Sequence, residues 1–290
     1  EFQLLHRVIN EQSVVSPDGS RRAKDGKDIA SDSLQNPSDP DATYREKAGK
    51  GHKGYVGHVV EDFDGEGNSV VTDYSYESNT HSDSDFCKET IKNNGKQEET
   101  LTIIADGTYG GTENQELAAA NNINLVVTSL VGRVPNEIHA EFVLSEDGTQ
   151  VITCPAGNKP IRCSYNSVSG MCRVVMERNT CNECPNRDKC KITLQKKSAV
   201  VNVSKKMVQR AKQVKLMKTE DYILLSHKRN GVEAVQSVLR RKYHVDDIPV
   251  MKKIRSKLFF GFKIMAVNCN KLKRYFQKQR AKSAQLAENA

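Results

Sequence analysis

The first candidate for chemistry is Asp106, which lies in the stretch LTIIADGTYGG at residues 101–111. Residues 101–105 form a short apolar run of the kind that makes a buried strand, and Asp106 follows this run directly. Ligand sites in open α/β sheets lie at the carboxyl ends of strands, and the glycines after Asp106 leave space for a metal ion beside its carboxylate. The alternative is a solvated loop aspartate or an Asx turn, which is the commoner role of such a sequence. On its own, Asp106 leaves both interpretations open.

The second candidate is Glu233, a single carboxylate in the basic segment KRNGVEAVQSVLRRKY at residues 228–243. The fixed positive charges of this segment are Lys228, Arg229, Arg240, Arg241 and Lys242. On a helix, Arg229 lies four residues before Glu233 and Arg240 seven after it, so the three side chains lie near one face. Glu233 could bind a divalent metal ion while the arginines hold phosphates. It could equally make helix ion pairs worth about 0.2–0.5 kcal/mol, or take the third position of a capping box that begins at Asn230.

The third candidate is a group of cysteines in the middle of the chain. The stretch CNECPNRDKC places three of them at a C-x2-C-x5-C spacing, which presents three thiolates to one ion. Three more lie upstream at intervals of nine residues: Cys154, Cys163 and Cys172. A zinc site needs a fourth ligand, for which all three upstream cysteines are candidates; the set taken as the hypothesis is Cys181, Cys184, Cys190 and Cys154. Reduced buried thiols and an iron–sulfur cluster are the alternatives, while disulfides are not expected without a secretion signal.

The charge is distributed unevenly along the 290 residues. Residues 1–150 carry 13 Lys and Arg against 27 Asp and Glu, a net charge of −14, whereas residues 151–290 carry 31 against 9, a net charge of +22. A strongly basic half favours a polyanionic partner, because each neutralised phosphate releases counterions. The charge therefore points to a nucleic acid more than to a solvated basic surface. No run of about 18 apolar residues is present, so no membrane span is expected.

The hydrophobic pattern predicts the elements that come before Asp106. Residues 54–61 and 69–76 are strand-like and flank a turn-like stretch, which predicts a hairpin. Residues 82–94 predict a helix that begins at Ser or Asp caps.

A strand, a helix and a second strand are then predicted in quick succession. The strand at 101–105 ends at Asp106, and the helix begins at Thr112 with Gln115 at capping-box spacing. Asn121 and Asn122 close this helix, and residues 123–130 form the second strand. Strand, helix and strand within so few residues imply a parallel pair and an α/β sheet.

The carboxyl-terminal part predicts a long amphipathic helix with Lys and Arg on its other faces. Its apolar stripe has spacings of three and four and consists of Met251, Ile254, Leu258, Phe262, Met265, Cys269, Leu272 and Phe276. Since Cys269 lies on this stripe, we expect its thiol in the core. The predicted organisation is a linker at 1–40, a catalytic domain at 41–131 continued at 206–280, a Cys-rich insertion with its own small core at 132–205, and a tail at 281–290.

Several motifs are absent: G-x-x-x-x-G-K-[ST], G-x-G-x-x-G, H-E-x-x-H and G-x-S-x-G. Their absence argues against NTPases, dinucleotide enzymes, zinc proteases and serine hydrolases.

Three ordered blocks resemble DDE-type transposases of bacterial insertion sequences: SDPDATYREKAGKGHKGYVGHVVED, IIADGTYGG and RNGVEAVQSVLRRKY. The resemblance covers about residues 38–280. The second catalytic aspartate of this family closes a strand before a Gly/Tyr loop, as Asp106 does before Tyr109. A segment inserted between that aspartate and the glutamate is usual in the family, and residues 132–205 occupy this place.

The family's glutamate lies in the pattern Y-x2-R-x3-E-x6-K. Arg229, Glu233 and Arg240 fit this pattern, with Arg in place of the final Lys. Ser226 stands where the pattern has Tyr, so the role of that position does not carry over.

The resemblance implies the α/β class, as a ribonuclease-H-like mixed sheet with flanking helices that is interrupted by the Cys-rich insertion and ends in long basic helices. It implies cleavage and joining of DNA strands with Mg²⁺ or Mn²⁺, with Asp106 and Glu233 as catalytic metal ligands. The residues expected to contact DNA are Arg229, Arg240, Arg241 and Lys242. The expected partners are transposon ends and target DNA, together with further copies of the chain in a homo-oligomer, in the cytoplasm of a bacterium and not at a membrane.

The resemblance also implies a first catalytic aspartate on the strand before the predicted hairpin. Residues 1–53 contain no convincing apolar strand that ends in Asp. Asp39, Asp41 and Asp73 are available, and none of them is assigned. The expectation is that the first aspartate lies upstream and that the chain is truncated at its amino end. A non-catalytic zinc-ribbon protein that binds nucleic acid, or an inactive transposase relic, is the alternative.

Overall fold

The protein has mixed α/β structure with several small sheets, as predicted at the level of fold class. The structure is a computed structural model that describes residues 1–47, 49–95, 98–228 and 230–288. It divides into two compact units. The first unit is Glu1–Thr90 with Asn230–Ala290, and the second unit is Ile91–Arg229.

The first unit begins with a helix and a small hairpin in the segment that was predicted to be a linker. Helix α1 has no buried residue, and polar contacts connect it to the segment that follows: Arg7 donates to the carbonyl of Pro40 (3.1 Å), and Glu11 accepts from the N–H of Leu34 (2.6 Å). Leu34, which follows the hairpin, is nearly inaccessible. The elements are α1 (Phe2–Gln12), β1 (Ser13–Val15), β2 (Arg21–Ala23) and the 3₁₀ helix η1 (Gly26–Asp28).

A three-stranded antiparallel sheet follows, in the order β3-β4-β5. Its strands are β3 (Thr43–Lys47), β4 (Lys50–Phe63) and β5 (Ser69–Ser78). The pairing of β4 with β5 confirms the predicted hairpin. Its register shifts by one residue between Val60 and Glu61, so Thr72 has no residue opposite it on β4. Such a bulge bends the strand at the edge of a sheet, and β5 is an edge strand.

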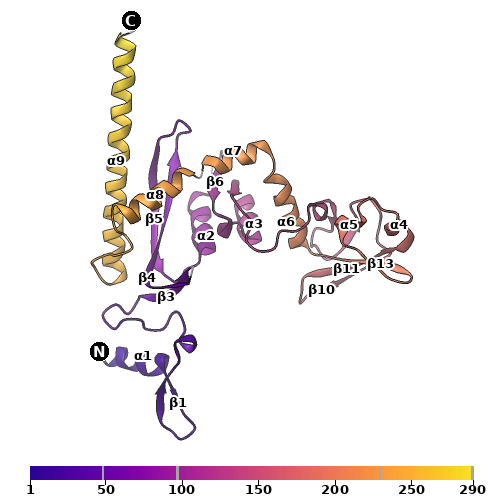
Figure 1. The fold of residues 1–290 in the computed structure, drawn as a ribbon, viewed down its shortest axis with the longest axis horizontal. Helices are drawn as coiled ribbons and strands as arrows, with labels where there is room; N and C mark the ends of the chain where they lie inside the picture. Colours follow the sequence, from indigo (N-terminus) through magenta and orange to yellow (C-terminus); the bar gives the residue numbers. More distant parts are fainter. Residues whose placement is uncertain (48, 96–97, 229, 289–290) are drawn as a thin grey trace. The chain divides into compact units, whose positions relative to one another are not determined.

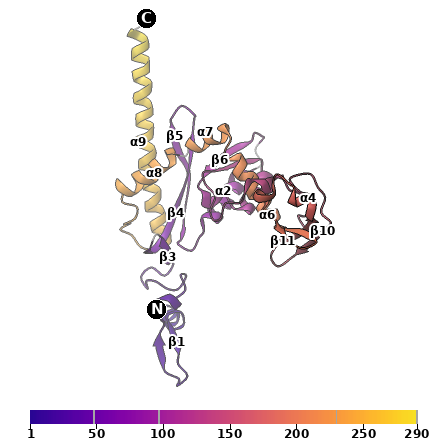
Figure 2. The same cartoon turned by 45° about the vertical axis from the view of Figure 1, so that its right-hand side comes forward.

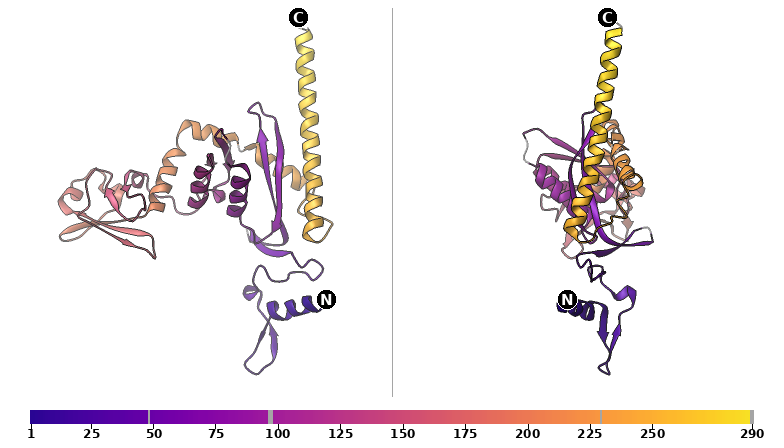
Figure 3. Two further views of the ribbon diagram at one scale, coloured as in Figure 1. Left: turned by 180° about the vertical axis from the view of Figure 1, so that it is seen from behind. Right: turned by 90° about the vertical axis from the view of Figure 1, so that its left-hand side faces the viewer.

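Two helices pack beside this hairpin and form the core of the first unit. They are α8 (Asn230–Arg241) and α9 (Lys253–Glu288), and α9 runs along the β4–β5 hairpin in Figures 1 and 3. Helix α9 continues to Glu288, through the residues that were predicted to be a tail. The buried side chains of this core are Val71, Tyr76, Val235, Leu239, Phe260, Ile264 and Val267.

The face that α9 buries differs from the predicted one. Cys269, expected in the core, is exposed, and Phe262 is 64% exposed. The buried residues are Phe260, Ile264 and Val267, which lie on a neighbouring face with the same spacing of three and four. Helix α9 therefore carries apolar residues on two faces, and only contact with β5 decides which of them is covered.

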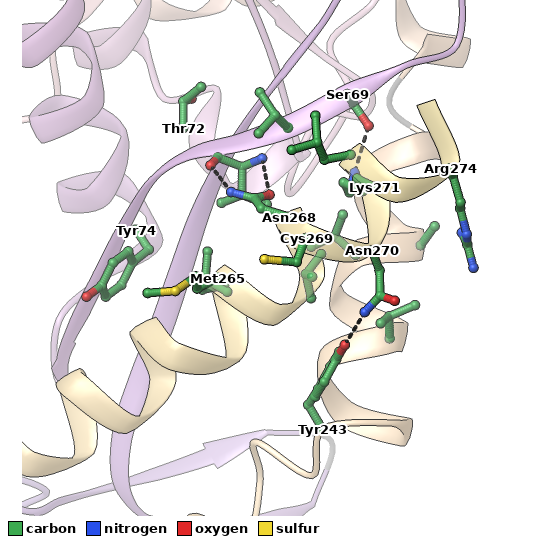
Figure 4. A pocket seen from close by; sticks show the side chains of 18 of the residues that line it. Ser69, Thr72, Tyr74, Tyr243, Met265, Asn268, Cys269, Asn270, Lys271 and Arg274 are labelled. Carbon is green, nitrogen blue, oxygen red and sulfur yellow. Dashed lines mark hydrogen bonds between the residues drawn. The ribbon is translucent and has the colours of Figure 1, made fainter. Parts of the chain in front are cut away.

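The docking of α9 on β5 is fixed by polar side chains. Asn268 donates its side-chain N–H to the carbonyl of Val71 (2.8 Å) and accepts from the Val71 backbone N–H (2.9 Å). Figure 4 shows both bonds. Nearby, Lys271 pairs with the almost fully buried carboxylate of Glu61 and donates to Ser69 Oγ (2.7 Å). Asn268 thus supplies the hydrogen bonds that a further strand would supply at this edge.

The second unit contains the parallel pair predicted from the sequence. Strand β6 (Leu101–Ala105) pairs in parallel with β7 (Ile123–Val127), and α3 (Thr112–Ala120) connects them after the 3₁₀ helix η2 (Gly107–Tyr109). The predicted capping box is wrong. Gly111 is the N-cap of α3 without a side-chain bond, and Gln115 instead donates to the carbonyl of Leu125 (3.2 Å).

The Cys-rich segment forms an antiparallel sheet in the order β10-β11-β13-β12, with a short pair β8–β9 beside it in sequence. Figure 2 shows β10 and β11 next to each other, with α4 close by. Its core includes Phe142, Val174, Met176 and Val201. The bounds are η3 (Glu137–Glu141), β8 (Val143–Leu144), β9 (Val151–Thr153), β10 (Arg162–Asn166), β11 (Met171–Glu177), α4 (Arg178–Asn182), α5 (Arg187–Cys190), β12 (Thr193–Leu194) and β13 (Ser198–Val203).

Helices α6 (Lys205–Leu216) and α7 (Glu220–Lys228) complete the second unit, and α2 (Asp83–Asn94), predicted as a helix, spans the boundary between the units along the chain. Ser204 caps α6 by accepting from the N–H of Met207 (3.1 Å). Among the described residues, no helix combines the length and apolarity that a membrane crossing requires.

The Asn268 contact yields a test of how α9 is held. Asn268→Ala removes both bonds to Val71 and should destabilise the first unit by about 1–3 kcal/mol, because the Val71 backbone groups lose their partner. Thermal unfolding should show a lower midpoint. The control is Gln277→Ala, which removes an exposed amide from the same helix. Equal midpoints for the two variants would show that the Asn268 bonds add nothing to stability.

Candidate functional site

Asp106 lies at the carboxyl end of β6, as predicted, and is the N-cap of η2. Its side chain is half-buried, and Oδ1 accepts a hydrogen bond from the N–H of Gly107 (2.7 Å). This hydrogen bond is a local turn contact, as expected if Asp106 has a structural role in the loop. It also holds the carboxylate at the strand end, where a ligand site in an α/β sheet is found.

The glycines after Asp106 serve close packing. A Cβ on Gly107 would lie 2.2 Å from Ser129 Oγ and 2.6 Å from the Ser129 carbonyl oxygen. A Cβ on Gly110 would lie 2.8 Å from the Val127 side chain. The loop therefore lies directly against the end of β7, and only glycine fits at these two positions without displacing that strand.

Two polar side chains from helices hold this end of the sheet. Asn114, fully buried on α3, donates to the carbonyl of Tyr109 (2.8 Å). Tyr222, buried on α7, accepts from the N–H of Val127 (2.7 Å) and donates to its carbonyl (2.8 Å). Burial raises the pKa of the Tyr222 phenol, so the hydroxyl keeps the proton that it donates. Gln213 on α6 donates to the same hydroxyl (2.8 Å).

Tyr222 was not predicted to be a site residue. It lies one helical turn before Ser226, the position where the family pattern has Tyr. Ser226 Oγ donates to the carbonyl of Ile223 within α7 (2.8 Å). A tyrosine near that position was a signal in the sequence, but its attachment to β7 depends on the fold.

Glu233 lies in the first turn of α8, with its side chain exposed. The neighbouring apolar positions Val235 and Leu239 are buried in the core of the first unit. A carboxylate in the first turn is favoured by the helix dipole. The side chains of residues 229–232 are outside the description, so neither the predicted DNA contact of Arg229 nor the capping box from Asn230 can be traced.

The other residues predicted to bind DNA lie at the end of α8 and are exposed. Arg240 forms an ion pair with Asp246, whose Oδ1 lies 3.5 Å from Arg240 Nε. Lys242 lies over the ring of Tyr243, with Nζ 5.4 Å from the ring centroid. Arg240 and Arg241 also balance the negative end of the helix dipole. Arg240 and Arg241 thus stabilise the end of α8 whether or not they contact DNA.

A groove of about 930 Å³ runs along α9 in the first unit and includes Lys242 in its lining. Figure 4 shows part of this lining, with Asn268 and Lys271 directed toward β5. The groove is lined by apolar side chains of α8 and α9, and basic residues contribute to it. These basic residues are Lys242, Lys271, Arg274 and Lys278.

Asp106 and Glu233 belong to different units, so the structure places each within its own unit and defines no distance between them. The unassigned aspartates have local roles or are exposed. Asp39 is buried and accepts from the hydroxyl of Tyr55, and Asp73 accepts from the N–H of Tyr74 (2.8 Å). Asp41 is exposed. None of these contacts identifies the first catalytic aspartate.

Oxygen ligands such as Asp106 and Glu233 have the chemistry that Mg²⁺ prefers. Within the described ranges, however, no group of three or more His, Cys, Asp or Glu side chains has the arrangement of a metal site. Asp106 and Glu233 therefore have the ligand chemistry that Mg²⁺ prefers. The described residues of each unit do not bring together a complete set of ligands for it.

The cysteines separate into two groups. Cys154, Cys181, Cys184 and Cys190 line one small cavity of the second unit. Cys172 lies instead beside Cys163, and its thiol donates to the carbonyl of Thr149 (3.2 Å). All eight cysteines are free of disulfides. The upstream cysteine that joins the C-x2-C-x5-C group is therefore Cys154.

Comparison with known proteins gives one match. The model of a family described as a transposase DDE domain matches residues 153–273, less than half of the chain. This match supports a DDE transposase, as the resemblance of the sequence implies. It includes Glu233 and the four clustered cysteines but not Asp106. No curated protein and no solved structure matches the chain significantly.

The Tyr222 contact predicts a local effect at the strand end near Asp106. Tyr222→Phe leaves the N–H and the carbonyl of Val127 without their buried partner, at a cost of about 1–3 kcal/mol. Hydrogen exchange of the Val127 amide should therefore become about tenfold faster or more. Tyr165→Phe, which removes an exposed hydroxyl from β10, serves as the control. Unchanged exchange at Val127 in Tyr222→Phe would contradict this anchoring role.

Proposed function

We propose that this chain is the catalytic region of a DNA transposase that cleaves and joins DNA strands. The observation that carries the proposal is the family match over residues 153–273, which includes the helix of Glu233. The position of Asp106 at the end of β6 supports it independently, because that residue lies outside the matched range. The strongly basic carboxyl-terminal half provides the charge that a DNA partner requires.

The proposed catalytic fold is ribonuclease-H-like. In its support, a long antiparallel hairpin (β4–β5) is followed in sequence by α2 and then by the parallel unit β6-α3-β7. The inserted Cys-rich sheet separates this unit from α8, which carries Glu233. This order is the one that the resemblance implies, with the second aspartate on a strand and the glutamate on a helix beyond an insertion.

In this proposal Asp106 and Glu233 hold Mg²⁺ or Mn²⁺. The ions would activate the attacking oxygen and stabilise the leaving oxygen of a phosphoryl transfer. The glycines of the Asp106 loop and the Tyr222 anchor keep the carboxylate at the strand end. The third carboxylate that the resemblance implies is not assigned among the described residues.

The cations at the end of α8 would bind DNA phosphates. Arg240 and Arg241 present guanidinium groups that suit phosphate oxygens, and Lys242 adds a charge at the groove along α9. Arg229 is proposed to join them on the resemblance alone. The DNA would comprise transposon ends and a target, and we propose that a homo-oligomer carries out the reaction in the cytoplasm of a bacterium.

The carboxylates provide the direct test. Asp106→Asn and Glu233→Gln should each reduce strand cleavage and joining at least a hundredfold, because each removes a charged oxygen ligand of the metal. The assay is Mg²⁺-dependent cleavage and joining of DNA that carries the ends of the encoding element, by the protein in its natural length. Binding of the same DNA should persist in both variants.

Matched controls separate the metal role from loss of charge. Glu220→Gln and Asp221→Asn neutralise exposed carboxylates on α7 and should retain activity. Full activity in Asp106→Asn or Glu233→Gln would overturn the assignment. DNA binding without any metal-dependent cleavage by the unmodified protein would favour a non-catalytic binding protein or an inactive relic.

The salt dependence of DNA binding tests the basic cluster. Replacing Arg240, Arg241 and Lys242 with Gln should lower the slope of log K against log salt by up to about 3, since each phosphate contact contributes about 0.9. Fluorescence anisotropy with labelled duplex DNA over a range of salt concentrations gives this slope.

The control makes the same change of charge in the acidic half of the chain. Arg21, Arg22 and Lys27 are exposed near the β1–β2 hairpin, and their replacement with Gln should leave the slope unchanged. If both triple variants lowered the slope equally, the cluster on α8 would have no special role in DNA binding.

A further inference from the structure

The second unit contains a small cavity into which four cysteines come together. These are Cys154, Cys181, Cys184 and Cys190. They come from two segments that are well separated in the sequence, the turn after β9 and the α4–α5 region. Tertiary structure therefore completes a set of four sulfur ligands, of which the C-x2-C-x5-C spacing provides three.

The first segment is a tight turn that begins at Cys154. The N–H of Cys154 donates to the carbonyl of Asn158 (2.9 Å), and the N–H of Gly157 donates to the carbonyl of Cys154 (2.8 Å). Gly157 has a φ of +79°, a left-handed conformation that suits glycine. These bonds hold the Cys154 backbone in one position at the edge of the cavity.

The second segment is held by helical hydrogen bonds. The N–H of Cys190 donates to the carbonyl of Asn186 (2.8 Å), and the N–H of Arg187 donates to the carbonyl of Cys184 (3.1 Å). Cys181 and Cys190 are buried, and Cys184 is half-buried. Cys181 on α4, Cys190 on α5 and Cys184 between the two helices all line the same cavity.

The thiols are close enough to affect one another electrostatically. Burial, followed by the neighbouring Cys184, Cys154 and Cys181 thiols, raises the pKa of Cys190 to about 11. Burial, followed by the Cys154 and Cys184 thiols and the Glu177 carboxylate, also raises the pKa of Cys181. A divalent cation reverses this balance, because it binds the thiolate form and releases the protons to solvent.

The size of the cavity limits what it can hold. Its volume is about 30 Å³, whereas a single water needs about 10–15 Å³ on this kind of measure. The space is therefore large enough for a single metal ion. Apolar side chains, including Phe142, Met176 and Val201, contribute to the same lining.

The other two upstream cysteines do not take part. Cys172 is fully buried, and its thiol donates to the carbonyl of Thr149 (3.2 Å). Cys163 lies beside Cys172, and its sulfur accepts from the N–H of Val151 (3.5 Å). Neither residue lines the cavity of the other four. They provide matched controls from the same small core.

We propose that Cys154, Cys181, Cys184 and Cys190 bind one structural Zn²⁺ in a tetrahedral site that ties the 154–158 turn to α4 and α5. Zn²⁺ accepts four thiolates at about 2.3 Å without an open position, as befits a structural ion. The described residues contain no ready-made group of metal ligands, so the four sulfur atoms would have to approach one another as the ion binds. The proposed zinc site does not depend on the proposed cleavage and joining of DNA strands.

Metal content of the purified, untagged chain is the primary test. The unmodified protein should contain about one zinc per chain by elemental analysis, as a closed structural site does. Cys181→Ser and Cys184→Ser should each reduce zinc below about half an ion, whereas Cys163→Ser and the exposed Cys269→Ser should retain it. Less than half an ion of zinc in the unmodified chain, or a full equivalent of iron, would overturn the proposal.

Cobalt substitution identifies the ligands. Co²⁺ in place of zinc should give sulfur-to-metal charge-transfer bands whose intensity corresponds to four thiolates. Cys154→Ser should lower this intensity by about a quarter and should release zinc to a chelator at least tenfold more readily. Unchanged spectra and zinc retention in Cys154→Ser would exclude it as the fourth ligand and refute the proposed site.

Folding is followed in the same samples by circular dichroism. Cys184 is half-buried, so serine at this position should leave the fold intact while removing a ligand. Loss of zinc from a folded Cys184→Ser variant supports the site. Retention of zinc in the folded Cys184→Ser variant would contradict the proposed site.

Discussion

Backbone groups at the edges of small sheets need partners, and this requirement organises both units. Strands β5 and β7 each lie at the edge of a sheet of only two or three strands. In each case one side chain from a distant helix bonds both the N–H and the carbonyl of a single residue. Asn268 does so for Val71, and Tyr222 does so for Val127. An unsatisfied pair at either position would cost about 1–3 kcal/mol per group if buried.

These two attachments connect the fold to the candidate catalytic residues. The Tyr222 bond steadies the end of β7, against which Gly107 and Gly110 press the loop of Asp106. The Asn268 bond orients α9, whose buried face packs with the apolar residues of α8, the helix of Glu233. Each candidate carboxylate thus lies in a unit where a neutral polar side chain fixes an edge strand. The proposed zinc ion would have a similar supporting role in the inserted sheet.

Much of the fold followed from local pattern. Alternation predicted the β4–β5 hairpin, and a short apolar run predicted β6 at residues 101–105. The order of strand, helix and strand predicted a parallel pair, because a crossover helix between neighbouring strands requires it. The predicted capping box failed, since the Gln115 side chain reached a carbonyl on β7 instead. A tertiary hydrogen bond can replace a local one at little cost, so spacing alone could not decide between them.

The sequence by itself determined the residue types that can do chemistry, the uneven charge, the elements around Asp106 and a resemblance that the family match supports. Only tertiary structure decided that Cys154 joins the downstream cysteines, and that Phe260 rather than Phe262 enters the core. The physical reason is the same in both cases. Helix α9 has two apolar faces, and three upstream cysteines have equivalent spacing, so the choice depends on which surface distant segments bring into contact.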